Sequence, residues 1–152
     1  MLIRCAKDAD FPRISEICHG SAILAGTCPG SAHFVAQEND RLVGYAGYRC
    51  RPGGDAVIEN EMILGTGADD EHSVVTLLAT LVEHARVRGF RLMLATVDAE
   101  DATAIAAHER LGFARATMMW ASRVGASERS RTVAMSLDLT GFQHEAVRHS
   151  IM

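Results

Sequence analysis

Lysine is nearly absent from this chain of 152 residues, which has one lysine beside 14 arginines and a net charge of −4 at pH 7. General affinity for nucleic acid needs a surplus of basic residues, so this composition argues against a nucleic-acid partner. Long apolar runs are also lacking: none approaches the roughly 18 residues of a membrane span, and the first ten residues carry acids where a signal peptide would be apolar. We therefore expect a cytoplasmic protein with no nucleic-acid or membrane partner.

Cysteine is scarce, and its spacing excludes the common metal motifs. There is no CxxC pair and no nearby Cys/His ladder of zinc-finger spacing, and the histidines add no ligand pattern, so we expect no metal site. We expect free, buried thiols, with a metal or a disulfide as the alternative. The four cysteines, all in the first third of the chain, are Cys5, Cys18, Cys28 and Cys50.

The sequence has no internal repeat or low-complexity stretch, and its 13 glycines and three prolines are scattered as turns. A chain of this length can bury the core of one domain. We expect a single domain over residues 1–140, followed by a polar tail over residues 141–152.

Hydrophobic periodicity predicts the order strand, helix, three strands, helix, strand, helix, two strands. The clearest helix covers residues 72–88, which have one apolar face and end before Gly89. Asp8 or Asp10 is expected to cap the first helix. A third helix is expected over residues 101–111. The expected strands are residues 2–6, 32–37, 41–50, 56–64, 90–97, 114–124 and 130–139.

The stretch "GTGADDEHSVV", residues 65–75, leads into the clearest helix. Glycines before a helix favour phosphate binding, because the first-turn N–H groups and the helix dipole attract anions. Here Asp69, Asp70 and Glu71 stand at the entrance, and residues 52–85 contain no basic side chain. Carboxylates at this position can cap the helix themselves. We expect a self-capped helix start and a negative field around it.

Glu59 and Glu61 lie two residues apart on a predicted strand and so share one face. A carboxylate on such a strand can act as a general base that takes a proton from a bound substrate. The alternative is that both acids are solvated or salt-bridged at a strand end.

The string "AAHERLGF", residues 106–113, resembles the GNAT acyltransferase superfamily, and "HERLGF" is closest to the phosphinothricin-acetyltransferase-like branch. "IENEMIL" and "LLATLVEHARVRGFRLMLATV" resemble the same branch, so the likeness covers roughly residues 2–139. It implies an α/β fold (α+β, three layers) with a GNAT-like mixed, mostly antiparallel central sheet of about seven strands flanked by helices. The sheet would splay open between the strands at 56–64 and 90–97.

The resemblance also implies acetyl-CoA as the co-substrate. Its pantetheine would pair with the backbone of the fourth strand, and its pyrophosphate would rest on the first turn of the following helix. The family's basic and glycine-rich signature is replaced here by Asp69, Asp70 and Glu71, which disfavours that second contact. Asp101 stands where relatives have an Asn that touches the cofactor, although we expect Asp101 to cap a helix. The implied cofactor-binding residues are Met62, Ile63, Leu64, His72, Ser73, Val74, Val75 and Asp101.

Three residues carry the implied chemistry. Glu59 matches the branch's general base, and Glu61 would recognise the cationic amine. His108 stands where many relatives have the Tyr that protonates the leaving thiolate, with a merely hydrogen-bonded histidine as the alternative. The resulting expectation is an N-acetyltransferase that moves an acetyl group from acetyl-CoA to a primary amine of a small molecule, as a homodimer. Two rivals remain: a degenerate domain that has lost CoA and binds a ligand or a partner, and an acyltransferase whose donor lacks the nucleotide end.

Overall fold

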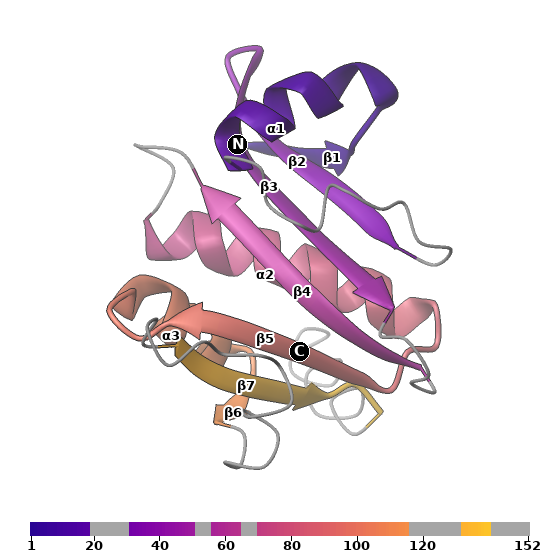
Figure 1. The fold of residues 1–152 in the computed structure, drawn as a ribbon, viewed down its shortest axis with the longest axis vertical. Helices are drawn as coiled ribbons and strands as arrows, with labels where there is room; N and C mark the ends of the chain where they lie inside the picture. Colours follow the sequence, from indigo (N-terminus) through magenta and orange to yellow (C-terminus); the bar gives the residue numbers. More distant parts are fainter. Residues whose placement is uncertain (19–30, 51–55, 65–69, 116–131, 141–152) are drawn as a thin grey trace, which may run out of the picture.

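The computed structural model describes residues 1–18, 31–50, 56–64, 70–115 and 132–140. They form a seven-stranded sheet in the order β1-β2-β3-β4-β5-β7-β6 (Figure 1). β4 and β5 pair in parallel and the other neighbours pair antiparallel, which confirms the mixed, mostly antiparallel sheet. The strands are β1 (Leu2–Cys5), β2 (Ala32–Glu38), β3 (Arg41–Cys50), β4 (Val57–Leu64), β5 (Leu92–Asp98), β6 (Ala114–Arg115) and β7 (Thr132–Asp138).

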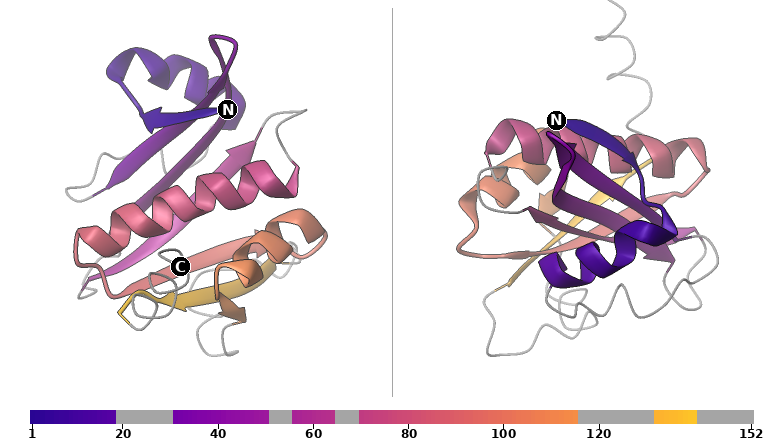
Figure 2. Two further views of the ribbon diagram at one scale, coloured as in Figure 1. Left: turned by 180° about the vertical axis from the view of Figure 1, so that it is seen from behind. Right: turned by 90° about the horizontal axis from the view of Figure 1, so that it is seen from above.

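Helices cover both faces of the sheet, so the three-layer expectation is confirmed. α2 (Glu71–Val87) and α3 (Ala102–Arg110) lie on one face, and α1 (Phe11–Cys18) lies on the other (Figure 2). Gly89 follows the C-cap residue Arg88 of α2, and its φ of 86° suits glycine just after a helix. Among the described residues, no helix is long and apolar enough to cross a membrane.

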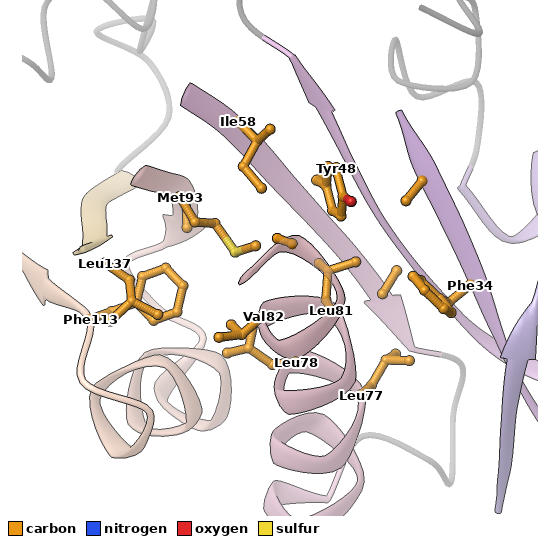
Figure 3. Packing of buried hydrophobic residues seen from close by; sticks show 14 of the residues in the cluster. Phe34, Tyr48, Ile58, Leu77, Leu78, Leu81, Val82, Met93, Phe113 and Leu137 are labelled. Atoms are coloured by element: carbon orange, nitrogen blue, oxygen red, sulfur yellow. The ribbon is translucent and has the colours of Figure 1, made fainter. Parts of the chain in front are cut away.

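The main core lies between the sheet and α2, because the apolar stripe of α2 faces the sheet. Leu77, Leu78 and Leu81 are fully buried against Ile58 and Met93 (Figure 3). A smaller cluster on the α1 face contains Ile14, Val35 and Tyr45. Met93 and Met135 are core residues, as expected, whereas Met118 and Met119 lie outside the described residues.

Two expectations near the N-terminus need correction. Asp8 and Asp10 form a short 3-10 helix, η1 (Asp8–Asp10), and the Asp10 carboxylate accepts from Arg4 and from the Lys7 backbone N–H rather than from the first turn of α1. Cys5 is free but exposed, because it ends the edge strand β1; Cys50 is free and half-buried. Cys28, the expected strand end at 116–124 and the tail at 141–152 lie outside the described residues.

Candidate active site

The parallel pair β4–β5 separates part-way along its length. Pairing runs from Val57 opposite Leu92 to Glu59 opposite Leu94 and stops there. On their outer sides β4 stays paired with β3 as far as Leu64, and β5 stays paired with β7 as far as Asp98. The two strands therefore diverge beyond Glu59, as the sequence resemblance implied, and no strand of the described residues pairs with the β5-facing backbone edge of β4 there (Figure 1).

A cavity of about 250 Å³ lies at this divergence. We call it the wedge cavity. β4 and β5 form its two walls, and one side of α3, from its N-cap Asp101 to His108, closes its base. Its described lining consists of Asn60, Glu61, Met62, Thr96, Val97, Asp98, Asp101, Ala104 and His108.

His108 reaches the wedge cavity from α3 and is only 3% exposed. Its Nδ1 lies 2.7 Å from the carbonyl oxygen of Ala104, which can only accept, so Nδ1 carries a proton. Burial lowers the pKa of His108, against a smaller opposing effect of the Ala104 carbonyl and Asp101. The ring is therefore neutral near pH 7, with Nε2 as its acceptor.

Asn60 supplies the partner of that acceptor. Its Nδ2 lies 3.4 Å from Nε2 of His108 and 3.5 Å from the sulfur of Met93, and the residue is 8% exposed. The sequence patterns did not predict a role for Asn60. The available signal is its position between Ile58 and Met62, where a polar side chain interrupts the core-facing positions of β4.

Glu59 and Glu61 share the α1 face of β4, as expected from their spacing, because Ile58 and Asn60 on the alternate positions face the core on the other side. Glu59 makes an ion pair with Arg49, its neighbour on β3, at 3.5 Å. Glu61 lines the wedge cavity, whereas Glu59 is not among its described lining residues. Glu61 and His108 are therefore both lining residues of the wedge cavity, although the Glu61 side chain projects to the α1 face.

The start of α2 carries its own negative charge. Asp70 is the N-cap residue, in an extended conformation with φ −69° and ψ 155°. Its side chain closes no capping hydrogen bond, but the nearby hydroxyl and N–H of Ser73 lower its pKa. Glu71 in the first turn forms an exposed ion pair with Arg110 of α3 at 3.2 Å. Asp69 and the glycines before it lie outside the described residues.

The backbone donors expected to hold a pyrophosphate are partly used within the helix. The N–H of Val74 donates to the carbonyl of Asp70 at 3.1 Å. In an α-helix the N–H of Val75 likewise has a partner four residues back. Of the four expected positions, His72 and Ser73 lie in the first turn, whose N–H groups have no intrahelical partner.

Asp101 caps α3, as expected. Its carboxylate accepts from the N–H of Ala104 at 3.0 Å. It also lines the wedge cavity together with Glu61 and Asp98. With three carboxyl side chains and no basic residue other than the neutral His108 in its described lining, this cavity attracts cations rather than anions.

A family model described as the acetyltransferase (GNAT) family matches residues 7–113. The chain belongs to this family. The matched region contains β4, α2, β5 and α3, and so it includes every described side of the wedge cavity. A search of curated protein sequences finds no match.

Solved structures of other family members share the fold. A ribosomal-protein-alanine N-acetyltransferase from Brucella melitensis is 22% identical, with a TM-score of 0.71, and the match covers 91% of this chain and 99% of that one. A phosphinothricin acetyltransferase from Sinorhizobium meliloti in complex with AcCoA is 22% identical, with a TM-score of 0.70 and coverage of 90% and 87%. A spermidine N-acetyltransferase chimera from Vibrio cholerae and hSSAT is 12% identical, with a TM-score of 0.71 and coverage of 93% and 99%. Because these neighbours differ in named activity, they establish the fold and leave the branch open.

Proposed function

We propose that this protein is an N-acetyltransferase that moves an acetyl group from acetyl-CoA to a primary amine of a small molecule. The observation that carries the proposal is the separation of β4 from β5 after Glu59 at a cavity lined by Glu61 and His108. Membership of the acetyltransferase family supports the same reaction class.

The free edge of β4 is suited to hold the extended arm of the donor. An extended chain can add to an exposed strand edge through main-chain hydrogen bonds. Beyond Glu59, the β5-facing edge of β4 has no strand beside it within the described part of the chain, and this part of β4 includes Met62–Leu64. We assign the pantetheine arm to that edge, so that the thioester end lies near Asn60 and His108. Acetyl-CoA would supply the activated carbonyl carbon.

The acceptor amine suits the charge of the wedge cavity. Glu61, Asp98 and Asp101 favour a cationic ligand, and an amine is an ammonium near pH 7. We assign proton removal from that ammonium to Glu61, because it lines the cavity, and give Glu59 the second place, because Arg49 holds its carboxylate. This exchanges the two roles expected from the sequence.

His108 is proposed to serve the leaving thiolate. It must first gain a proton at Nε2, which the attacking nitrogen loses as it becomes the amide, because Nδ1–H is already committed to the carbonyl of Ala104. Asn60 donates to Nε2 in the resting state and fixes the ring, so protonation of Nε2 displaces this hydrogen bond. His108→Ala is expected to lower kcat by about 100-fold while the KM for the amine changes little. Unchanged kinetics would remove His108 from the mechanism.

The experiment is an acetyl-transfer assay that follows thiol release from acetyl-CoA with methylamine, spermidine and a peptide beginning with alanine. Glu61→Gln is expected to lower kcat for the responding amine by about 100-fold or more. Glu59→Gln is the matched control, with the same change of charge two residues away, and is expected to have an effect of less than about tenfold. Equal losses in both variants would contradict the assignment of Glu61.

A second function is favoured by the start of α2. Asp70 and Glu71 stand where a pyrophosphate would bind, so the domain could take a donor without the nucleotide end, or bind a ligand without catalysis. Calorimetry with acetyl-CoA separates these functions. Micromolar binding supports the acetyltransferase. If a folded protein does not bind acetyl-CoA at millimolar concentration, the binding module is supported instead.

A further inference from the structure

Three residues form a row across the sheet on the face that α1 covers. His33 on β2 lies directly opposite Gly47 on β3, and Gly47 lies directly opposite Glu61 on β4. Residues opposite each other on antiparallel strands project to the same face, with Cβ atoms about 5 Å apart. The row therefore leads from the wedge cavity at Glu61 to His33, with a glycine between them.

The hydroxyl of Tyr45 occupies the space above Gly47. A Cβ atom on Gly47 would overlap that hydroxyl and would lie 2.9 Å from the carbonyl oxygen of Ala32. Tyr45 precedes Gly47 by two residues on the same strand, so both face α1, and the tyrosine is fully buried. Glycine thus allows the phenol to lie along the sheet, with its oxygen in the gap between His33 and Glu61.

His33 binds this hydroxyl on its inner side. Its Nδ1 lies 2.8 Å from Oη of Tyr45, and its Nε2 lies 3.3 Å from Oγ of Ser31. The rings of His33 and Tyr45 are stacked, with centroids 6.0 Å apart, and Phe11 of α1 packs edge-on against His33. Burial lowers the pKa of His33, so the ring is neutral near pH 7 and can accept a proton.

The outer side of His33 opens into a second cavity, of about 340 Å³, which shares no described lining residue with the wedge cavity. A proton that reaches His33 can leave there without crossing the amine site. Around His33, the contact from α1 is the ring of Phe11, and that from β3 is the Tyr45 hydroxyl. The other titratable or charged side chains in the described lining of this second cavity are Cys5, His84 and Arg88.

We propose that Tyr45 and His33 are positioning residues for Glu61 that also remove the proton it takes from the acceptor amine. The proposal rests on the proposed function, in which Glu61 is the base. One carboxylate oxygen of Glu61 is buried, and Glu61 lies directly opposite Gly47, the residue over which the Tyr45 hydroxyl sits. Gly47 is the residue that makes this arrangement sterically allowed.

The proton balance of this relay is closed. The N–H bond of the ammonium breaks as Glu61 gains the proton. Glu61 then passes a proton to the oxygen of Tyr45 while the hydroxyl proton of Tyr45 moves to Nδ1 of His33. Glu61 is again a carboxylate, and Tyr45 is again a neutral phenol. His33 becomes an imidazolium, which loses one proton to water and returns to the tautomer whose Nδ1 accepts from Tyr45. One proton per turnover is what acetylation of an ammonium must release.

The first test needs no turnover. Histidine titrations followed by NMR measure the pKa of His33 in the wild-type protein and in Glu61→Gln. Loss of the carboxylate is expected to lower the pKa of His33 by about half a unit, because an anion stabilises the imidazolium. When Tyr45→Phe is also present, Glu61→Gln is expected to lower the pKa of His33 by less than half that amount. The relay would be overturned if Glu61→Gln left the pKa of His33 unchanged. It would also be overturned if Glu61→Gln shifted that pKa equally with Tyr45 and with Tyr45→Phe.

The second test uses a matched pair of tyrosines. Tyr45 and Tyr48 are both fully buried on β3, and each has its hydroxyl 2.8 Å from Nδ1 of a histidine, His33 or His84. Tyr48 packs in the core cluster on the opposite face of the sheet from Tyr45. Tyr45→Phe is expected to lower kcat by about tenfold or more, to alter the pH profile, and to leave the KM for acetyl-CoA within about twofold.

Tyr48→Phe removes the corresponding bond to His84, together with the one that the Tyr48 hydroxyl accepts from Arg88, and is expected to leave kcat within about twofold of the wild-type value. Equal loss of kcat in the two variants would show a structural effect and contradict the relay. If the wild-type protein transfers no acetyl group to any amine of the panel, the proposed function fails, and the His33 titration still decides whether the row is coupled.

Discussion

Nδ2 of Asn60 and Nε2 of His108 lie 3.4 Å apart at the base of the wedge cavity, where they join β4 to α3. Because Nδ1 of His108 donates to the carbonyl of Ala104, the amide of Asn60 must donate to Nε2. The pair fixes the tautomer of a buried histidine and holds it neutral at the cavity. This arrangement makes both the stability of the fold and its chemistry sensitive to protonation of His108.

The first prediction concerns stability at acid pH. The pKa of folded His108 lies below its ordinary value of 6.5. As the pH falls below about 7, the unfolded chain therefore binds more protons than the folded one, and stability declines until the lowered pKa is reached. His108→Gln is expected to reduce the loss of urea midpoint between pH 7.5 and 5.5. The exposed His72→Gln is the control, and an equal pH slope in both variants would contradict the prediction.

The second prediction concerns Gly47. Gly47→Ala is expected to destabilise the protein by about 1–3 kcal/mol, because the new methyl group overlaps the Tyr45 hydroxyl and approaches the carbonyl oxygen of Ala32. Combining it with Tyr45→Phe removes the hydroxyl and is expected to restore part of the loss. Urea unfolding measures both effects. A neutral Gly47→Ala, or a double variant whose loss equals the sum of the single losses, would contradict this packing.

The third prediction concerns the ion pair between Glu71 and Arg110. Removing the guanidinium in Arg110→Gln leaves Glu71 uncompensated at the start of α2, so the affinity for acetyl-CoA is expected to fall about threefold. Stability should change by less than about 1 kcal/mol, because the pair is exposed. Arg13→Gln, which breaks the exposed pair with Glu16, is the control and should leave acetyl-CoA binding unchanged. Tighter binding in Arg110→Gln would contradict the electrostatic account.

Local sequence patterns predicted most of the helices and strands, because each element shows the hydrophobic periodicity of its own type. The apolar stripe of α2 and the glycine after it located the helix to within one residue. The turn at Asn39 and Asp40, both with positive φ, lies between the strands expected at 32–37 and 41–50. Asp101 caps α3 for the reason that its residue type suggests. These features depend on neighbours in the sequence, so the sequence alone carries them.

The site was less predictable because its geometry depends on register between distant strands. Spacing placed Glu59 and Glu61 on one face, but the pairing of Arg49 with Glu59, and the end of pairing at Leu94, decide which acid meets the cavity. Asn60 is polar in a position that the pattern assigns to the core. Cys5 is exposed because β1 is an edge strand. The order of the strands in the sheet decides this, and the residues next to Cys5 in the sequence do not reveal it.

The central claim is that the wedge cavity accepts the thioester arm, while Asp70 at the start of α2 denies the nucleotide end its usual anion site. Calorimetry with acetyl-CoA and with S-acetylpantetheine, which lacks the nucleotide, tests this directly. The account predicts dissociation constants within about threefold of each other, because the diphosphate gains little from this helix start. An affinity for acetyl-CoA about 100-fold higher than that for S-acetylpantetheine would contradict it.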